Sequence, residues 1–159
     1  MKVIGVDPGY DRLGVSVIEY DEGKERLIHS SCLETDKELE LNDRLKILGD
    51  SFLSILNTYS PTTLAIETIF FNKNAKTAIG VAQARGIIIY LAQQHGCEVF
   101  EFGPQEIKVA ITGYGKSDKN AVIDMVKRLV SDVPDDALDD EYDAIAVGVT
   151  CLAHHGRNR

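Results

Sequence analysis

The order of its apolar segments constrains the fold of this chain more than any other feature. Three short segments typical of strands come first, and short apolar segments then alternate with longer segments of helical periodicity. The first three strands are expected at residues 3–6, 15–20 and 27–33, separated by turn residues. This order predicts an α/β fold: a mixed five-stranded sheet, with an antiparallel meander and parallel strands, and helices on both faces.

The second half of the pattern supplies the helices and the remaining strands. Leucines at helical spacing predict a helix at residues 41–59, which Pro61 ends. A short buried strand is expected at 64–67, a helix with alanines and glycines on one side at 74–94, and a fifth strand at 98–102. The alanines and glycines of that helix allow close packing against a neighbouring element.

Helices are expected to complete the fold. Pro104 suits the first position of one helix, and a second is expected at residues 120–130 with Ser117 as its N-cap. The chain closes with a helix over about 138–154. We find no internal repeat, linker or low-complexity segment.

Length and composition predict one domain. A chain of 159 residues, 44% of them hydrophobic, can bury one sizeable core and is too short for two ordinary domains. We expect this domain to span residues 1–153, followed by a flexible tail over 154–159 that includes both terminal histidines. No segment resembles a signal peptide or a membrane span, which predicts a cytoplasmic protein. Its cysteines, Cys32, Cys97 and Cys151, are too widely spaced to indicate a disulfide framework or a zinc site.

The charge is unevenly distributed. A formal net charge of -8 argues, taken alone, against a nucleic-acid-binding protein. Acidic side chains, however, concentrate between residues 133 and 143, whereas basic side chains outnumber acidic ones between 72 and 128. This segregation is compatible with an acidic metal centre bordered by a phosphate-binding surface, and equally with ordinary solvated helix faces.

Four carboxylates stand where the predicted elements could bring them together. Asp7 directly follows the first strand, and Glu67 is the last residue of the fourth. Asp140 and Asp143, three positions apart on the last helix, share one face. Such a cluster repels itself without a cation, and Mg²⁺ and Mn²⁺ are the ions that carboxylate oxygens favour. Two such ions could support phosphodiester hydrolysis.

Each acid also has a purely structural interpretation, and the prediction depends on the whole set. Asp7 precedes Pro8 and Gly9 and suits a turn, while acids early in a helix are favoured by the helix dipole. Spacing also leaves the third ligand open, because Asp139 lies four positions before Asp143 and could share its face in place of Asp140.

Basic and aromatic side chains near these acids are candidates for nucleic-acid contact. Lys108, Lys116 and Lys119 flank a glycine-containing loop suited to phosphate binding, and Phe70 could stack on a base. The structural alternatives are solubilising lysines and a core aromatic. The loop sequence GYGKS imitates the end of a P-loop, but Ala110 replaces the first glycine and a helix precedes it, so we reject a nucleotide-binding loop.

Four sequence blocks, in the right order, closely resemble the RuvC family of Holliday-junction resolvases, within the ribonuclease H-like superfamily. The opening block is IGVDPGYDRLG, and the central block is LAIETIFFNKNAKTAIGVAQARG. The third is IKVAITGYGKSDKNAVIDMV, and the closing block is DDEYDAIAVGVTCLAHH, with its DxxDA pattern. The resemblance therefore extends over nearly the whole chain.

The resemblance implies a ribonuclease H-like fold and a magnesium-dependent endonuclease that makes paired symmetric nicks in four-way DNA junctions during recombination and repair. It implies that the catalytic metal ligands, for two Mg²⁺ ions with Mn²⁺ as a substitute, are Asp7, Glu67, Asp140 and Asp143. Phe70 would wedge or stack at unpaired bases, while Lys108 and Lys119 would contact the scissile backbone. A homodimer is implied, which suits the twofold symmetry of a junction. The branch-migration proteins RuvA and RuvB are implied as partners.

Other functions compete with this prediction. An actin-like or sugar-kinase ATPase domain can open with a similar phosphate loop, but that fold needs a second lobe with its own phosphate loop, for which the chain is too short. A ribonuclease H-like nuclease acting on RNA and a junction-binding module without catalysis are further alternatives, and the intact acids argue against the last.

Overall fold

The computed structural model describes residues 1–69 and 75–156. Its strands form a five-stranded sheet in the order β3-β2-β1-β4-β5. The first three strands pair antiparallel, and β4 and β5 continue the sheet parallel to β1, as the sequence predicted. The strands are β1 (Lys2–Asp7), β2 (Arg12–Asp21), β3 (Lys24–Glu34), β4 (Thr63–Glu67) and β5 (Glu98–Phe102).

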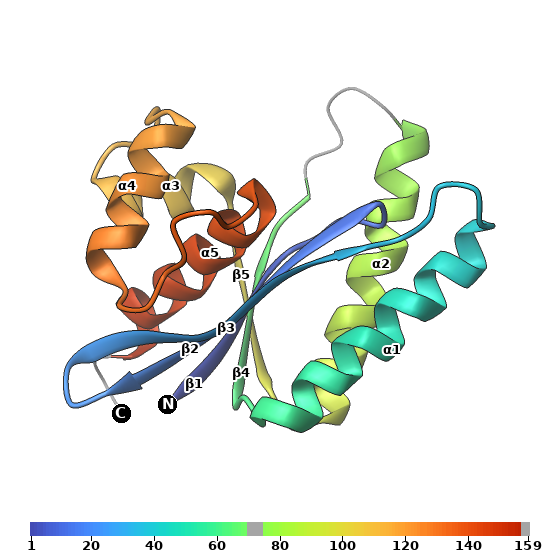
Figure 1. Cartoon of the computed structure of the whole chain (residues 1–159), viewed down its shortest axis with the longest axis horizontal. Coiled ribbons are helices and arrows are strands. Elements are labelled where there is room, and N and C mark those ends of the chain that lie inside the picture. Colours follow the sequence, from blue (N-terminus) through green and yellow to red (C-terminus); the bar gives the residue numbers. More distant parts are fainter. Residues whose placement is uncertain (70–74, 157–159) are drawn as a thin grey trace.

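Helices cover both faces of this sheet. Helices α1 and α2 lie on one face, and α3, α4 and α5 lie on the other (Figure 1). Their bounds are α1 (Leu41–Tyr59), α2 (Ala75–Gln94), α3 (Pro104–Thr112), α4 (Lys119–Leu129) and α5 (Asp139–His155). The arrangement confirms the predicted α/β fold. None of the helices within the described residues is long and apolar enough to cross a membrane.

Side-chain alternation along the central strands produces two separate cores. On β1, Ile4 and Val6 pack with α1 and α2, whereas Val3 packs with the helices of the opposite face. Strand β4 follows the same rule, with Leu64 and Ile66 in one core and Ala65 in the other. The last residues of both strands, Asp7 and Glu67, therefore belong to the face that α5 covers.

Helix α5 lies unusually close to β1 and β2 because the residues between them are small. A Cβ atom on Gly5 would overlap the backbone carbonyl of Ala144, and one on Gly14 would overlap that of Asp140. Between these positions, the hydroxyl of Ser16 donates a 2.9 Å hydrogen bond to the carbonyl of Ala144. These contacts set the depth and register of α5 on the sheet.

The turn after β1 is shorter than the sequence predicted. We expected residues 7–14 to form a turn, but β2 already begins at Arg12, and Asp7 pairs with Gly14 across the ladder. Aspartate and glycine favour turns locally, but the pairing of Arg12 and Leu13 with β3, and of Gly14 with β1, overrides that preference. The start of β2 is therefore rigidly tied to the end of β1.

The predicted N-cap of α4 is also wrong by one residue. The carboxylate of Asp118, and not Ser117, caps this helix by accepting a 2.8 Å hydrogen bond from the amide of Ala121. Ser117 instead donates its hydroxyl to the carbonyl of Tyr114, at 2.7 Å, inside the preceding loop. Local propensity could not distinguish two neighbouring capping residues.

The C-terminal end of α5 differs from the predicted flexible tail. His154 and His155 are the last residues of the helix, and the ring of His155 stacks on that of Phe100 with 3.9 Å between centroids. Aromatic packing against β5 therefore orders these residues, which the sequence analysis had placed in a flexible tail. Residues 157–159 lie outside the described part of the chain.

The first prediction concerns the contact between β2 and α5. Gly14→Ala should lower the free energy of unfolding by roughly 1–3 kcal/mol, because the new methyl group would displace the backbone at Asp140. Gly103→Ala is the matched control, since a Cβ there meets only the Thr68 hydroxyl at 3.9 Å. Urea denaturation of both variants measures the difference, and equal stability would contradict the proposed close packing.

Candidate functional site

Asp7 and Glu67 lie beside each other at one end of the sheet. Strands β1 and β4 are parallel neighbours, and Val6 is paired with Ile66, so the carboxylates one residue further along are adjacent. Both belong to the face covered by α5 and are only partly accessible to solvent. This geometry agrees with the convergence predicted from the strand ends.

Burial and mutual repulsion disfavour negative charge at this position. Burial, followed by the charges of Glu67, Asp143 and Asp140, raises the pKa of Asp7 from 3.8 to about 8. Burial and Asp143 also raise the pKa of Glu67, although a hydrogen bond with Asp7 partly opposes this rise. Four carboxylates thus interact electrostatically at one place, which favours a bound proton or a cation.

Helix α5 carries the other two carboxylates, and each is paired with a cation. Asp143 Oδ2 lies 3.2 Å from the ammonium group of Lys119, and Asp140 Oδ2 lies 3.2 Å from Arg12 Nε. Burial raises the pKa of Asp143, while Lys119 opposes the rise. The carboxylates therefore face the site from α5 with part of their charge compensated.

Asp139 occupies a different position from its neighbour. Its side chain is 67% exposed and pairs with Lys119 at 3.2 Å, whereas the side chain of Asp140 is 24% exposed. Asp140, unlike Asp139, also contributes to the raised pKa of Asp7. Of the two candidates for the third ligand, Asp140 is the one whose charge acts on the buried Asp7.

The carboxylates do not form a preassembled metal-binding geometry. Among the described residues, no three acidic, histidine or cysteine side chains come together closely enough to hold an ion. In this arrangement, Lys119 and Arg12 each pair with an oxygen that a metal at this site would need. The donor set itself consists only of carboxylates, and its mutual repulsion fits a hard divalent cation.

A pocket of about 250 Å³ opens beside these acids. Glu67 and Asp143 line it together with Lys108 and Lys119, so acidic and basic side chains face the same space. Lys108 belongs to α3 and Lys119 begins α4, which explains how distant sequence positions meet here. Lys116, the third predicted phosphate contact, is exposed in the loop between these helices and does not line the pocket.

One predicted nucleic-acid contact cannot be located. Phe70 lies outside the described residues, as does neighbouring Phe71. The strand that precedes them ends at Glu67, and α2 begins at Ala75. The segment that carries Phe70 therefore connects an element of the site to a helix on the other face.

Two residues at the site were not identified from the sequence. Arg12, assigned to a turn, is the cation that pairs with Asp140. Glu141 accepts a 2.6 Å hydrogen bond from the Ser30 hydroxyl of β3 and a 3.0 Å bond from the amide of Leu138. Glu141 therefore caps α5 and ties its first turn to the sheet. The S/T-like pattern of a capping box was absent, because Leu138 holds the N-cap position.

Comparison with known proteins identifies the family. Residues 3–151 match the family model described as crossover junction endodeoxyribonuclease RuvC. The chain belongs to the RuvC family. A RuvC relative from Thermosipho melanesiensis is 46% identical over 153 residues, which cover 96% of this chain and 97% of the relative. The relative from Halothermothrix orenii is 40% identical over 151 residues, covering 94% of this chain and 90% of the relative.

Solved RuvC structures agree with the fold. The structure of Thermus thermophilus RuvC superimposes with a TM-score of 0.87 at 27% identity, covering 99% of this chain and 96% of that one. T. thermophilus RuvC in complex with a Holliday junction substrate gives a TM-score of 0.90 at 28% identity, with coverage of 97% and 94%. These matches confirm the ribonuclease H-like fold that the resemblance of this RuvC-family chain implied.

The raised pKa of Asp7 predicts a pH dependence of stability. Between about pH 4 and pH 8 the folded, metal-free protein keeps a proton on Asp7 that the unfolded chain releases. Stability should therefore fall as pH rises through this window, by at most about 1.4 kcal/mol per pH unit from this group. Urea denaturation in the presence of a chelator measures the slope.

The control for this prediction is a carboxylate elsewhere on the sheet. Asp7→Asn should flatten the slope, because its amide does not titrate, whereas Asn in place of the exposed Asp21 should leave it unchanged. An unchanged slope in Asp7→Asn would show that Asp7 does not carry the buried proton.

Proposed function

We propose that this chain is a structure-selective endonuclease that resolves four-way (Holliday) DNA junctions by metal-dependent hydrolysis, making paired symmetric nicks during recombination and DNA repair. One observation carries the proposal: in a RuvC-family chain, Glu67 and Asp143 line one pocket together with lysines, and Asp7, whose pKa burial and these acids raise, lies beside Glu67. An ATPase or an RNA nuclease is less well supported, since the relatives are named as endodeoxyribonucleases.

The proposed metal ligands are the four carboxylates of the site, and nucleases of this family are metal-dependent. We assign Mg²⁺, with Mn²⁺ as a substitute and two ions per site, to Asp7, Glu67, Asp140 and Asp143. Bound ions would activate the attacking water and stabilise the leaving oxygen of the phosphodiester. The burial of Asp7 and Glu67 keeps these two ligands in place on rigid strand ends, while α5 supplies the others.

The lysines around the pocket are proposed to hold the DNA backbone. Lys108 and Lys119 line the same pocket as Glu67 and Asp143, which suits contact with the phosphate being cut. Lys116 extends from the exposed loop between them and is proposed to contact a neighbouring phosphate. Phe70 is proposed, from the family resemblance, to stack at unpaired bases of the junction centre.

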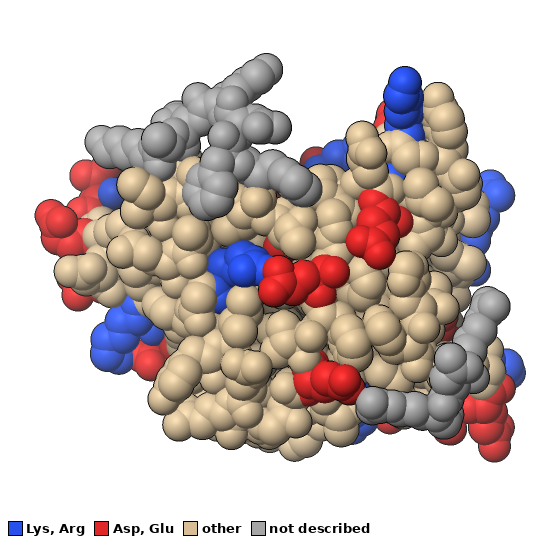
Figure 2. All heavy atoms as spheres, turned by 180° about the vertical axis from the view of Figure 1, so that it is seen from behind, with Lys and Arg blue, Asp and Glu red and all other residues tan. Residues whose placement is uncertain are grey.

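The net charge of -8 requires these contacts to be local. On the face seen in Figure 2, charged side chains form small separate groups within a mainly uncharged surface, and no broad basic area is visible among the described residues. The net charge favours weaker or more salt-sensitive DNA binding than a basic protein would have. Recognition of junction shape, more than overall charge, would then select the substrate.

A homodimer is proposed because two symmetric nicks require two active sites. The face of α1 and α2 away from the sheet supports it: Ile79 and Tyr90 are 59% and 62% exposed. A shallow groove of about 610 Å³ between these helices includes Leu45, Leu53 and Ile87 in its lining. Apolar exposure of this kind favours a protein contact. RuvA and RuvB are proposed as further partners from the resemblance, and action in the cytoplasm is proposed from the sequence, in which no segment resembles a signal peptide or a membrane span.

Cleavage assays test the proposed function directly. A synthetic four-way junction, a linear DNA duplex and an RNA strand are each incubated with the protein, with and without Mg²⁺. We expect paired nicks in the junction alone, and only with the metal. Preferential RNA cleavage, or ATP turnover in a parallel assay, would contradict the proposal.

Two neighbouring substitutions test the third ligand. Asp140→Asn should abolish Mg²⁺-dependent nicking while keeping junction binding, because the cluster loses a ligand and a charge but the phosphate contacts remain. Asp139→Asn, on the exposed side of the same helical turn, should lower nicking only several-fold. Gel-shift and nicking assays on folded variants at saturating metal make the comparison. If Asp139→Asn is the inactive variant, the assignment is wrong by one residue.

A further inference from the structure

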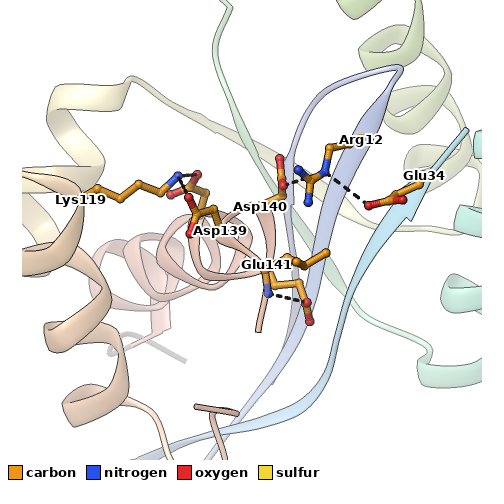
Figure 3. A network of polar contacts seen from close by, with 8 residues as sticks. Arg12, Glu34, Lys119, Asp139, Asp140 and Glu141 are labelled. Atoms are coloured by element: carbon orange, nitrogen blue, oxygen red, sulfur yellow. Dashed lines mark hydrogen bonds and ion pairs between the residues drawn. The ribbon is translucent and has the colours of Figure 1, made fainter. Parts of the chain in front are cut away.

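Arg12 joins two acidic residues at the edge of the site. Its Nε lies 3.2 Å from Asp140 Oδ2 and 3.5 Å from Glu34 Oε1. Figure 3 shows the guanidinium between the two carboxylates, with Lys119 and Asp139 forming a separate pair nearby. One cation is therefore shared between a proposed metal ligand on α5 and an acid on β3.

The sheet fixes this arrangement. Arg12 stands two residues before Gly14, so its side chain belongs to the strand face on which Gly14 contacts the backbone of Asp140. Glu34 is the cross-strand partner of Arg12, and Cys32 is the partner of Gly14. Backbone pairing thus places Arg12 beside Glu34, on the strand face that meets Asp140, within reach of both carboxylates.

The Arg12 pair has a direct consequence for metal binding. A divalent cation and the guanidinium would both bind the oxygens of Asp140. In the structure, where the Arg12–Asp140 pair is formed, the described acids do not converge on an ion-binding geometry. The Arg12 side chain is 45% exposed, so the pair is of the weak, solvent-screened kind that a divalent cation can displace. Glu34, which is 62% exposed, offers the guanidinium an alternative partner when Asp140 turns towards the metal.

We propose that Arg12 is a positioning residue that competes with the metal for Asp140, and that Glu34 tunes this competition by drawing Arg12 away. The inference rests on the proposed metal site and adds a control of its affinity. Arg12 holds Asp140 near the site in the absence of metal and transfers to Glu34 when the ion binds. The metal affinity is thereby kept lower than the four carboxylates alone would give.

The test is a titration of the metal-free protein with Mn²⁺ alone, in which free Mn²⁺ is followed by electron paramagnetic resonance. Arg12→Gln should bind Mn²⁺ about fivefold more tightly than the wild type. The ion no longer has to displace the exposed Arg12–Asp140 ion pair, which is of the strength measured for such pairs. Arg12→Lys keeps the charge and should stay near the wild-type affinity. Glu34→Gln should bind about twofold more weakly, because Arg12 then has Asp140 as its remaining carboxylate partner.

The double variant separates competition from a general electrostatic effect. If Glu34 acts through Arg12, Glu34→Gln should have no effect on Mn²⁺ affinity in the Arg12→Gln background. A general field effect would weaken binding equally in both backgrounds and would overturn the inference, as would an Arg12→Gln protein that binds no more tightly than the wild type. Absence of Mn²⁺ binding by the folded wild-type protein would instead overturn the proposed metal site. Thermal denaturation confirms that each variant is folded.

Discussion

The close contact between α5 and the central strands is the constraint on which the site depends. At Gly5 and Gly14 no side chain separates the strand from the backbone of the helix, and the Ser16 hydroxyl hydrogen-bonds the helix backbone directly. A helix held further from the sheet would carry Asp140 and Asp143 away from Asp7. The same small residues that allow packing therefore also determine how near the carboxylates of two different elements lie.

That packing brings carboxylates close enough to repel one another, and nearby cationic side chains offset part of the repulsion. Burial, followed by the charges of Glu67, Asp143 and Asp140, raises the pKa of Asp7 to about 8, and burial also raises the pKa values of Glu67 and Asp143. Lys119 pairs with Asp139 and Asp143 of α5, Arg12 pairs with Asp140, and neither cation comes from the helix itself. Stability without metal and readiness to bind metal are thus opposed requirements, and ion pairs that solvent partly screens satisfy both.

Much of this could be predicted from sequence because it follows local periodicity. The bounds of short apolar runs placed Asp7 and Glu67 at strand ends, helical spacing placed Asp140 and Asp143 on one face, and the order of segments predicted the sheet. Arg12 was missed because its segment has the composition of a turn, and only pairing with Glu34 of β3 makes it part of a strand. The ion pairs of the α5 acids, and the choice of Asp118 as a cap, likewise depend on tertiary contacts that periodicity does not contain.

The central claim is that strand ends and α5 together form one metal site. The most direct measurement is the position of Mn²⁺, located by anomalous scattering in crystals of the protein grown with the ion. The account predicts Mn²⁺ bonded to Asp7 and Glu67 and to at least one of Asp140 and Asp143, with the corresponding ion pair to Arg12 or Lys119 broken or lengthened. Mn²⁺ bound elsewhere, with both ion pairs intact and Asp7 without a metal contact, would contradict it.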